Sequence, residues 1–308
     1  MKLTGKTDIY IFNPDDKKAV LNTKGKVGSV YLGKRESDNM PVIIKRINAP
    51  VIKNCDDLDR FLTETKLKIS HPDIVNTIEH IIANKNLYII REYVQGIDLK
   101  QALKKRKIRK KFNTQFYVKC IIKVLESLDS LHKQNIFHCD IKPSNIILKY
   151  NNSADDIDIN NPQIKLIDLG MARSMKKYNI KFSSSPFALI YSPPEQVLNI
   201  NSLINATTDI YSTAITLYEL IINKPAFDND NPLILISLQT VYPLTKDKKI
   251  PAELFKVLLK ASNKYPFPKP PHMYKGKDLL DKLIEGQEGR YSNTKDFIEA
   301  LKDLKSPS

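Results

Sequence analysis

The pattern of hydrophobic residues changes once along this chain of 308 residues, and this change limits the folds that the chain can adopt. In the first hundred residues, β-branched and aromatic side chains separated by turn residues predict strands over residues 19–31, 42–47 and 87–94. One helix is predicted among these strands, from residue 57 to about residue 69. From about residue 98 onward helical patterns dominate, over residues 115–132, 208–222, 251–264 and 293–304.

A strand-rich first part followed by a helix-rich second part is typical of an α+β fold with two lobes. We expect a small β-rich N-lobe over about residues 1–94 and a larger helical C-lobe over about residues 98–304. A hinge at about residues 92–97 would join them, and residues 305–308 would form a short tail. A ligand cleft is expected where the two lobes meet.

The composition, with 42% hydrophobic and 27% charged residues, is that of a soluble globular protein. The sequence has neither the apolar segment of a secretory signal nor an uncharged apolar run of about 18 residues. Three widely spaced cysteines fit neither a disulfide framework nor a zinc site, so we expect a reducing, cytoplasmic compartment. The abundance of Lys, Ile and Asn suggests an AT-rich genome, such as that of a protist or of a bacterium, and leaves open an effector that is secreted into a host cell.

The net charge is +15, and seven of the eight residues from Lys104 to Lys111 are basic. Such a block predicts either a solvated helix end or a contact with an acidic partner or another anionic surface. A nucleic-acid surface is not expected, because the block lacks the interleaved aromatic side chains on which bases stack.

A polar stretch, residues 138–145, lies between an apolar helical pattern and an apolar run. It offers a carboxylate at Asp140, an ammonium at Lys142 and a carboxamide at Asn145. Phosphoryl transfer needs these groups, because an acceptor orients the attacking hydroxyl, a cation meets the γ-phosphate and an oxygen ligand holds Mg²⁺. Asp168, which follows a predicted strand, could reach the same ion, although Asp-x-Gly can equally form a simple turn.

Two glycines and a lysine in the strand-rich part could hold phosphates. Gly25 and Gly28 lie in a predicted strand–turn–strand, where glycine lets backbone N–H groups approach a phosphate closely; a plain hairpin is the alternative. Lys45 ends the next apolar strand, and it becomes a phosphate ligand only if a carboxylate holds it. Glu64, in the predicted helix, is the candidate partner; otherwise it is a surface residue.

Together these motifs resemble those of the eukaryotic-type Ser/Thr protein kinase family, over nearly the whole chain. Residues 138–145 resemble the family's His-Arg-Asp-x-Lys-Pro-x-Asn loop, and residues 168–170 resemble its Asp-Phe-Gly motif. Glu195 resembles the Glu of the Ala-Pro-Glu motif, Arg290 its usual partner, and Asp209 the buried Asp that hydrogen-bonds the catalytic-loop backbone. We expect structural roles for these last three residues.

The resemblance implies that residues 1–304 form a protein kinase domain that binds ATP between its lobes. Asp140 would accept or orient the proton of a Ser or Thr hydroxyl on a protein substrate, and Lys142 would neutralise charge on the γ-phosphoryl group. Asn145 and Asp168 would carry Mg²⁺, for which Mn²⁺ could substitute. The implied nucleotide-binding residues are Gly25, Gly28, Val30, Ile43, Lys45 (held by Glu64), Glu92, Val94, Ile147 and Asp168.

Two departures from the family pattern affect how the site is interpreted. Cys139 replaces the Arg that normally pairs with an activation-loop phosphate. We therefore predict activity without phosphorylation of the serines at 183–185. Arg91 falls at the gatekeeper position before Glu92, where a buried guanidinium needs a carboxylate or a route to solvent.

Two other functions fit the same motifs. A pseudokinase or scaffold would share the fold without turnover and would bind a partner through its basic surface. A small-molecule or lipid kinase would share the spacing of Asp140 and Asn145, although the Lys142-Pro143 pair and the long segment after Asp168 favour a protein substrate.

Overall fold

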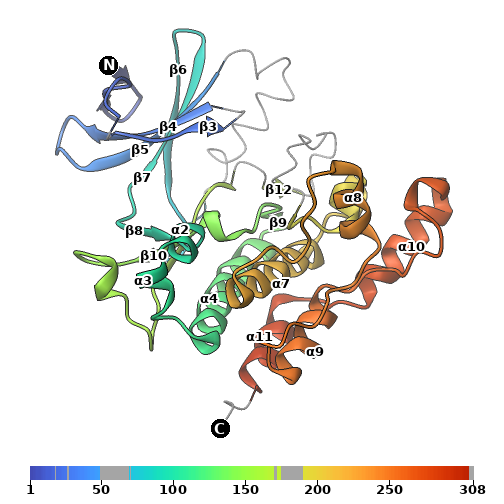
Figure 1. Ribbon diagram of the computed structural model, residues 1–308. Helices are drawn as coiled ribbons and strands as arrows, with labels where there is room; N and C mark the ends of the chain where they lie inside the picture. Colours follow the sequence, from blue (N-terminus) through green and yellow to red (C-terminus); the bar gives the residue numbers. More distant parts are fainter. Residues whose placement is uncertain are drawn as a thin grey trace. The chain divides into compact units, whose positions relative to one another are not determined.

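The computed structural model describes residues 1–17, 19–25, 28–48, 69, 71–169, 172–174 and 190–304. The chain forms two compact units, Met1–Gln95 and Gly96–Ser308, which are described separately below (Figure 1). Residues 57–68 of the expected helix, with Glu64, and the serines at 183–185 lie outside the described residues. A sheet in the first unit and mainly helices in the second confirm the predicted α+β class.

The first unit is built on one antiparallel sheet, drawn in blue to cyan in Figure 1. Its strands follow the order β1-β2-β4-β5-β7-β6, and β3 pairs with β4. Nearly every second residue of β4 and β5 is buried, as expected of strands that cover a core with one face. The strands are β1 (Lys2–Thr4), β2 (Ile9–Ile11), β3 (Val20–Gly25), β4 (Gly28–Arg35), β5 (Pro41–Ile47), β6 (Thr77–Ala83) and β7 (Asn86–Glu92).

The observed strands differ from the prediction in three ways. Two strands, over residues 20–25 and 28–35, occupy the range expected at 19–31, so β4 extends four residues beyond it. β7 ends at Glu92, two residues early, because its ladder with β5 stops at Val42 and the next residue, Pro41, has no N–H to donate. The prediction also missed β6 and the β1–β2 hairpin. The β6–β7 turn uses Asn84 and Lys85, both with positive φ, in place of the Asn-Gly pair that usually marks such turns.

The second unit is mainly helical, and its helices α4 and α7 lie side by side (Figure 1). Nearly every residue of α7 is buried. The helix begins after Asn205, whose side chain accepts a hydrogen bond from the Thr207 N–H, and ends at Asn223 in the left-handed conformation. The helices are α2 (Leu99–Lys104), α3 (Arg106–Arg109), α4 (Thr114–His132), α6 (Pro194–Val197), α7 (Ala206–Ile222), α8 (Pro232–Thr240), α9 (Ala252–Ala261), α10 (Gly276–Glu288) and α11 (Thr294–Lys302).

The predicted helices correspond to α4, α7, α9 and α11, and each starts within two residues of its expected position. The largest difference is at the end of α9, which stops at Ala261 instead of residue 264. Ser262 closes the helix by donating its hydroxyl to the Leu258 carbonyl, and the chain then turns so that Lys264 is buried. Among the described residues, no helix combines the length and the apolar character that a membrane span requires.

Three short strand pairs position the loops of the second unit. β10 (Ile146–Lys149) lies between β8 (Gly96–Asp98) and β11 (Ile164–Leu166), and β9 (Ile136–Phe137) pairs with β12 (Arg173–Ser174). These ladders are antiparallel. They hold the segment that begins after β9 and the segment that follows β11 at fixed points of the same unit.

Candidate active site

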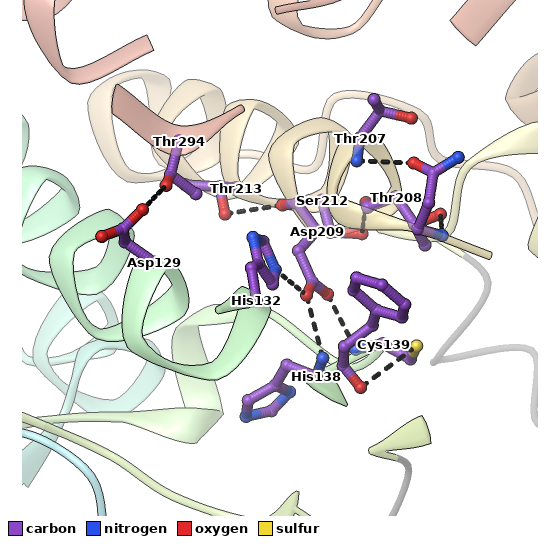
Figure 2. A network of polar contacts seen from close by, with 12 residues as sticks. Asp129, His132, His138, Cys139, Thr207, Thr208, Asp209, Ser212, Thr213 and Thr294 are labelled. Carbon is purple, nitrogen blue, oxygen red and sulfur yellow. Dashed lines mark hydrogen bonds and ion pairs between the residues drawn. The ribbon is translucent and has the colours of Figure 1, made fainter. Parts of the chain in front are cut away.

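The backbone of the predicted catalytic loop is fixed by Asp209, near the start of α7. One carboxylate oxygen of Asp209 accepts the N–H of Cys139 at 2.8 Å, and the other accepts the N–H of His138 at 2.9 Å. The second oxygen also lies 2.8 Å from Nε2 of His132, at the end of α4. Figure 2 shows the carboxylate between the His132 ring and the two backbone N–H groups. The expected contact of Asp209 with the loop is therefore confirmed.

Asp209 carries its charge although it is fully buried. Burial by itself would raise its pKa, but the hydrogen bond from His132, the neighbouring imidazoles and the Cys139 N–H together lower the pKa below its ordinary value. The carboxylate thus gains enough from its donors to remain ionised without a Lys or Arg partner among the described residues.

The remaining groups of the loop are also held from several sides. Gln196 of α6 donates to the Cys139 carbonyl at 3.0 Å, and the Thr216 hydroxyl of α7 donates to the Ile141 carbonyl at 3.4 Å. The Asp140 N–H donates to Nδ1 of His138 at 3.3 Å. Burial lowers the pKa of His138, although the nearby carboxylates oppose this shift, and a neutral ring is what an acceptor nitrogen requires.

Cys139 has a left-handed backbone, with φ of 62°. A residue with a Cβ atom adopts this conformation at a cost, and such residues concentrate at functional sites. Its thiol donates to the Phe137 carbonyl at 3.5 Å, and its side chain packs with Phe137 and Ile204 in a small apolar cluster. The position where the family usually has Arg is therefore filled by buried apolar contacts.

The side chains of the loop converge on the Asp140 carboxylate. Nζ of Lys142 lies 2.8 and 2.7 Å from its two oxygens. The Asn145 amide donates both to the Asp140 carboxylate, at 2.9 Å, and to the Asp140 carbonyl, at 2.8 Å. The Asp140 side chain is 13% exposed and so stays within reach of solvent. The structure thus brings together Asp140, Lys142 and Asn145, as the sequence predicts.

Asp168 is placed beside this group by the β10–β11 ladder. Ile146 pairs with Leu166, and the Ile167 N–H donates to the Asn145 carbonyl at 2.9 Å. Asp168 therefore follows directly on a residue that is bonded to Asn145. Its φ of 65° is a left-handed conformation that Asp tolerates better than most residues. The Asn145 amide nitrogen donates to Asp140. The Asn145 amide oxygen and the Asp168 carboxylate are of the ligand types that Mg²⁺ prefers.

The predicted residues of the first unit lie on neighbouring strands of its sheet. Lys45 stands in register with Val30 on one side and Ile89 on the other, and Ile43 stands in register with Arg91. Arg91 is buried. Glu92 exchanges hydrogen bonds with Asn76: its N–H donates to the Asn76 carbonyl, and its carboxylate accepts the Asn76 N–H.

Gly25 and Gly28 face each other at the end of the β3–β4 pair. A Cβ atom at Gly28 would lie 1.7 Å from the Arg46 carbonyl oxygen, so the close approach of two strands requires glycine there. This packing requirement accounts for Gly28 without a phosphate. Val94 follows the end of β7 in the first unit, and Ile147 is paired with Asp98 and Lys165 in the second.

The predicted contact between Glu195 and Arg290 is confirmed as a fully buried ion pair. Two guanidinium nitrogens of Arg290 lie 2.7 and 3.1 Å from the two oxygens of Glu195. The Thr208 hydroxyl donates to Glu195 as well, and Nε of Arg290 donates to the Asn263 carbonyl. Every charge is matched, which is the condition under which a buried ion pair is tolerated.

Sequence reasoning missed two further buried contacts. His132 was assigned only to a helix end, although it donates to Asp209. Glu219 of α7, which is 1% exposed, is bonded by the Tyr191 hydroxyl at 2.5 Å and by Lys100 of α2. The partners of His132 and Glu219 lie 77 and up to 119 residues away, so only the tertiary fold reveals them.

Fold and site together define a protein kinase domain. The family model for this domain matches residues 23–301, and the chain belongs to the eukaryotic-type Ser/Thr protein kinase family. This confirms the resemblance seen in the motifs.

Among similar proteins are probable serine/threonine-protein kinases of Clostridium perfringens, 27% identical over 250 residues, and of Streptomyces coelicolor, 29% identical over 257 residues. Each match covers 79% of this chain, and 34% and 36% of the respective relative. The serine/threonine-protein kinase ULK3 of Mus musculus is 28% identical over 207 residues, which are 66% of this chain and 40% of that protein. The chain thus spans about a third of the length of the curated relatives it matches.

Proposed function

We propose that the protein is an active, ATP-dependent Ser/Thr kinase that transfers the γ-phosphoryl group to a hydroxyl of a protein substrate. The observation that carries this proposal is the Asp140 carboxylate, held by Lys142 and Asn145 on a loop whose backbone is fixed by Asp209. A carboxylate with fixed position and access to solvent can accept a hydrogen bond from an attacking hydroxyl and take its proton. Lys142, beside it, supplies a positive charge for the phosphoryl group.

Asn145 and Asp168 are the residues that would hold Mg²⁺, or Mn²⁺ in its place. One amide oxygen and one carboxylate suit these ions, which are usually bound through few protein ligands together with substrate phosphates. When bound, the ion neutralises charge on the transferred phosphoryl group. The protein contributes a fixed spacing of the two ligands, because the Ile167–Asn145 backbone bond ties their segments together.

ATP binding involves both units in this proposal. In the first unit we assign the phosphates to Lys45, with Glu64 as its partner, and to the backbone around Gly25 and Gly28. The adenine contacts are the backbone of Glu92 and Val94 and the side chains of Val30, Ile43 and Ile147. The register of Lys45 next to Val30 supports this assignment, because it puts a charged and an apolar contact on adjacent strands. We also propose a reducing, cytoplasmic setting, with which the free, buried thiols of Cys120 and Cys139 are compatible.

The test is phosphorylation of generic basic protein substrates with Mg·ATP, with wild type beside Asp140→Asn. We expect kcat to fall by a factor of about 10²–10⁴ because the hydroxyl loses its acceptor, with ATP affinity nearly unchanged. Asp303→Asn, an exposed carboxylate, is the matched control and should keep full activity. Phosphosite mapping reports the hydroxyl class.

Two results would contradict the proposal. ATP binding without turnover in the wild type would favour a pseudokinase. Turnover of small alcohols or lipids, with no phosphorylated protein, would favour a small-molecule kinase.

The apolar surroundings of Cys139 indicate that activity does not require phosphorylation of the serines at 183–185. A phosphate on the serines at 183–185 would find no guanidinium at position 139, and the Phe137–Ile204 cluster already holds this side chain. We expect the triple Ser→Ala variant to keep its kcat within a factor of about two, because position 139 has no cation for a phosphate on these serines to engage. Abolished turnover in a variant that still melts cooperatively would contradict this.

A further inference from the structure

A basic surface occupies the junction of α2 and α3. We define it by six exposed side chains: Lys104, Lys105, Arg106, Lys107, Lys110 and Lys111. Figure 1 shows α2 and α3 as short helices that precede the long α4. Only Lys111 of these six makes an ion pair in the described part of the chain.

The basic surface is held in place at both ends. Leu99 and Leu103 of α2 are buried before it, and Phe112 is buried after it, stacked on Phe116 of α4 at 4.0 Å between ring centroids. Arg109 turns back and donates to the Leu103 carbonyl at 3.2 Å. The cations are therefore displayed from an ordered corner of the second unit, with less conformational freedom to lose on binding than a tail would have.

Folding does not account for this concentration of charge. α3 has no fully buried residue, and only Ile108 and Arg109 are half-buried, so its side chains contribute little to the core. Within α3, Arg106, Lys107 and Arg109 are all basic, and Arg106 and Arg109 are neighbours on the helix surface, so their charges repel each other. Such a concentration of exposed positive charge indicates a partner of opposite charge.

The chain already shows which chemistry the basic surface accepts. Lys111 forms its ion pair with Asp155, in the polar loop of residues 151–162, and Lys119 donates to the Asn160 carbonyl of the same loop. Lys111 and, more weakly, Lys107 lower the pKa of Asp155. One end of the surface thus binds a carboxylate from an exposed polypeptide segment, and the other five cations stay open to solvent.

We propose that the basic surface is a docking site for an acidic segment of a protein substrate, separate from the hydroxyl that is phosphorylated. This inference rests on the proposed kinase function and names a substrate class for it. A peptide is favoured over single-stranded nucleic acid because the block has no exposed aromatic side chain for stacking. It is favoured over a membrane because the only apolar residue in the block, Ile108, is half-buried and cannot insert.

Docking at a second point raises the local concentration of the hydroxyl at Asp140 and so lowers KM without changing kcat. Exposed ion pairs each change affinity by a factor of about two, so three or four of them amount to about tenfold. The effect on KM should disappear in 0.5 M salt. The Debye length is about 4 Å at that concentration, so exposed charges are largely screened from each other.

The experiment uses two peptides that share one phosphorylatable segment, one of them extended through Gly-Ser linkers of several lengths by a run of Glu. The test variant carries Lys104→Gln, Lys105→Gln, Lys107→Gln and Lys110→Gln. The matched control removes four exposed lysines elsewhere, through Lys246→Gln, Lys248→Gln, Lys275→Gln and Lys277→Gln. We expect about tenfold lower KM for the extended peptide in the wild type and the control, and equal KM values in the test variant.

Fluorescence anisotropy of the labelled Glu segment, which has no hydroxyl, tests the docking separately from catalysis. Binding that the test variant loses and the control keeps supports the inference even if neither peptide is phosphorylated, a result that would count against the kinase function alone. Equal binding by all three proteins would overturn the inference. So would wild-type binding to phosphatidylserine vesicles or duplex RNA that the test variant loses, with none to the Glu segment.

Discussion

Two buried carboxylates, one in each unit, are both stabilised by hydrogen bonds, but they hold different parts of the protein in place. Asp209 of α7 accepts hydrogen bonds from His132 and from the backbone N–H groups of His138 and Cys139. Glu79 of β6 accepts them from the Thr7 and Tyr10 hydroxyls and from the Lys6 and Thr7 N–H groups. Neither has a Lys or Arg partner among the described residues, and the hydrogen bonds lower the pKa of both although burial acts to raise it.

The difference lies in where the donors come from. Glu79 fastens the β1–β2 hairpin to β6, and Gly5 passes so close that a Cβ atom there would lie 2.5 Å from the carboxylate. Its effect ends at the edge of a sheet. Asp209 fastens the loop that carries Asp140, so the same kind of bonding fixes the position of the proposed catalytic carboxylate. A buried carboxylate therefore acquires a functional role from the segment it binds, not from its own chemistry.

The largest loss of stability is expected at the Glu195–Arg290 pair, because there the buried carboxylate is bound by a full opposite charge. We expect Arg290→Met to lower the free energy of unfolding by about 3–5 kcal/mol, since it leaves Glu195 buried without its cation. Urea denaturation monitored by circular dichroism measures this loss. A loss below 1 kcal/mol would mean that Glu195 is protonated or hydrated in the variant.

Asp209→Asn should lower both stability and activity. The amide offers a donor where one backbone N–H needs an acceptor, which costs about 3 kcal/mol in a fully buried site. The loop should also shift, and a displacement of about 1 Å reduces kcat about 100-fold. Activity must be measured where the variant is still folded, with Asp303→Asn as the control. Normal kcat in the folded variant would show that Asp209 does not position Asp140.

Glu79→Gln should separate the two effects. We expect a loss of about 2 kcal/mol, because the amide can satisfy only part of the donors of the hairpin. The kcat per folded molecule should be unchanged, with Glu285→Gln as an exposed control. A large fall in kcat at full folding would break the comparison, because it would connect the hairpin to catalysis.

The smallest expected effect is that the stability contributed by Asp209 and by Glu79 decreases at acidic pH. The ordinary pKa values are 3.8 for Asp209 and 4.5 for Glu79, and both are lower in the folded protein. Their contribution to stability is therefore fully present above about pH 5 and is lost as the pH falls through the folded-state values. In denaturant titrations, the deficit of each variant relative to wild type should shrink from pH 6 to pH 3. A deficit that grows toward acid would reverse the assigned direction of the shifts.

Features that depend on residues close together in the sequence were predictable, and features that depend on distant residues were not. The helix α4 was predictable because its apolar period is long and Asn113 caps it, and Asp140, Lys142 and Asn145 were predictable because they act within six residues. Glu79 gave no signal, because its donors come from residues 69 to 73 positions away. The β1–β2 hairpin was missed since its strands have three residues each, too few for an alternating pattern to stand out.

The binding of two loop amides by Asp209 also has a consequence for exchange with solvent. The N–H groups of His138 and Cys139 belong to no helix, and a polar loop ordinarily exchanges its amide hydrogens quickly. Here both amides donate to the Asp209 carboxylate, which is inaccessible to water. Their hydrogens therefore exchange with solvent only when the loop separates from α7. The amide hydrogens of the predicted catalytic loop should thus be protected for as long as those of the helical core that surrounds it.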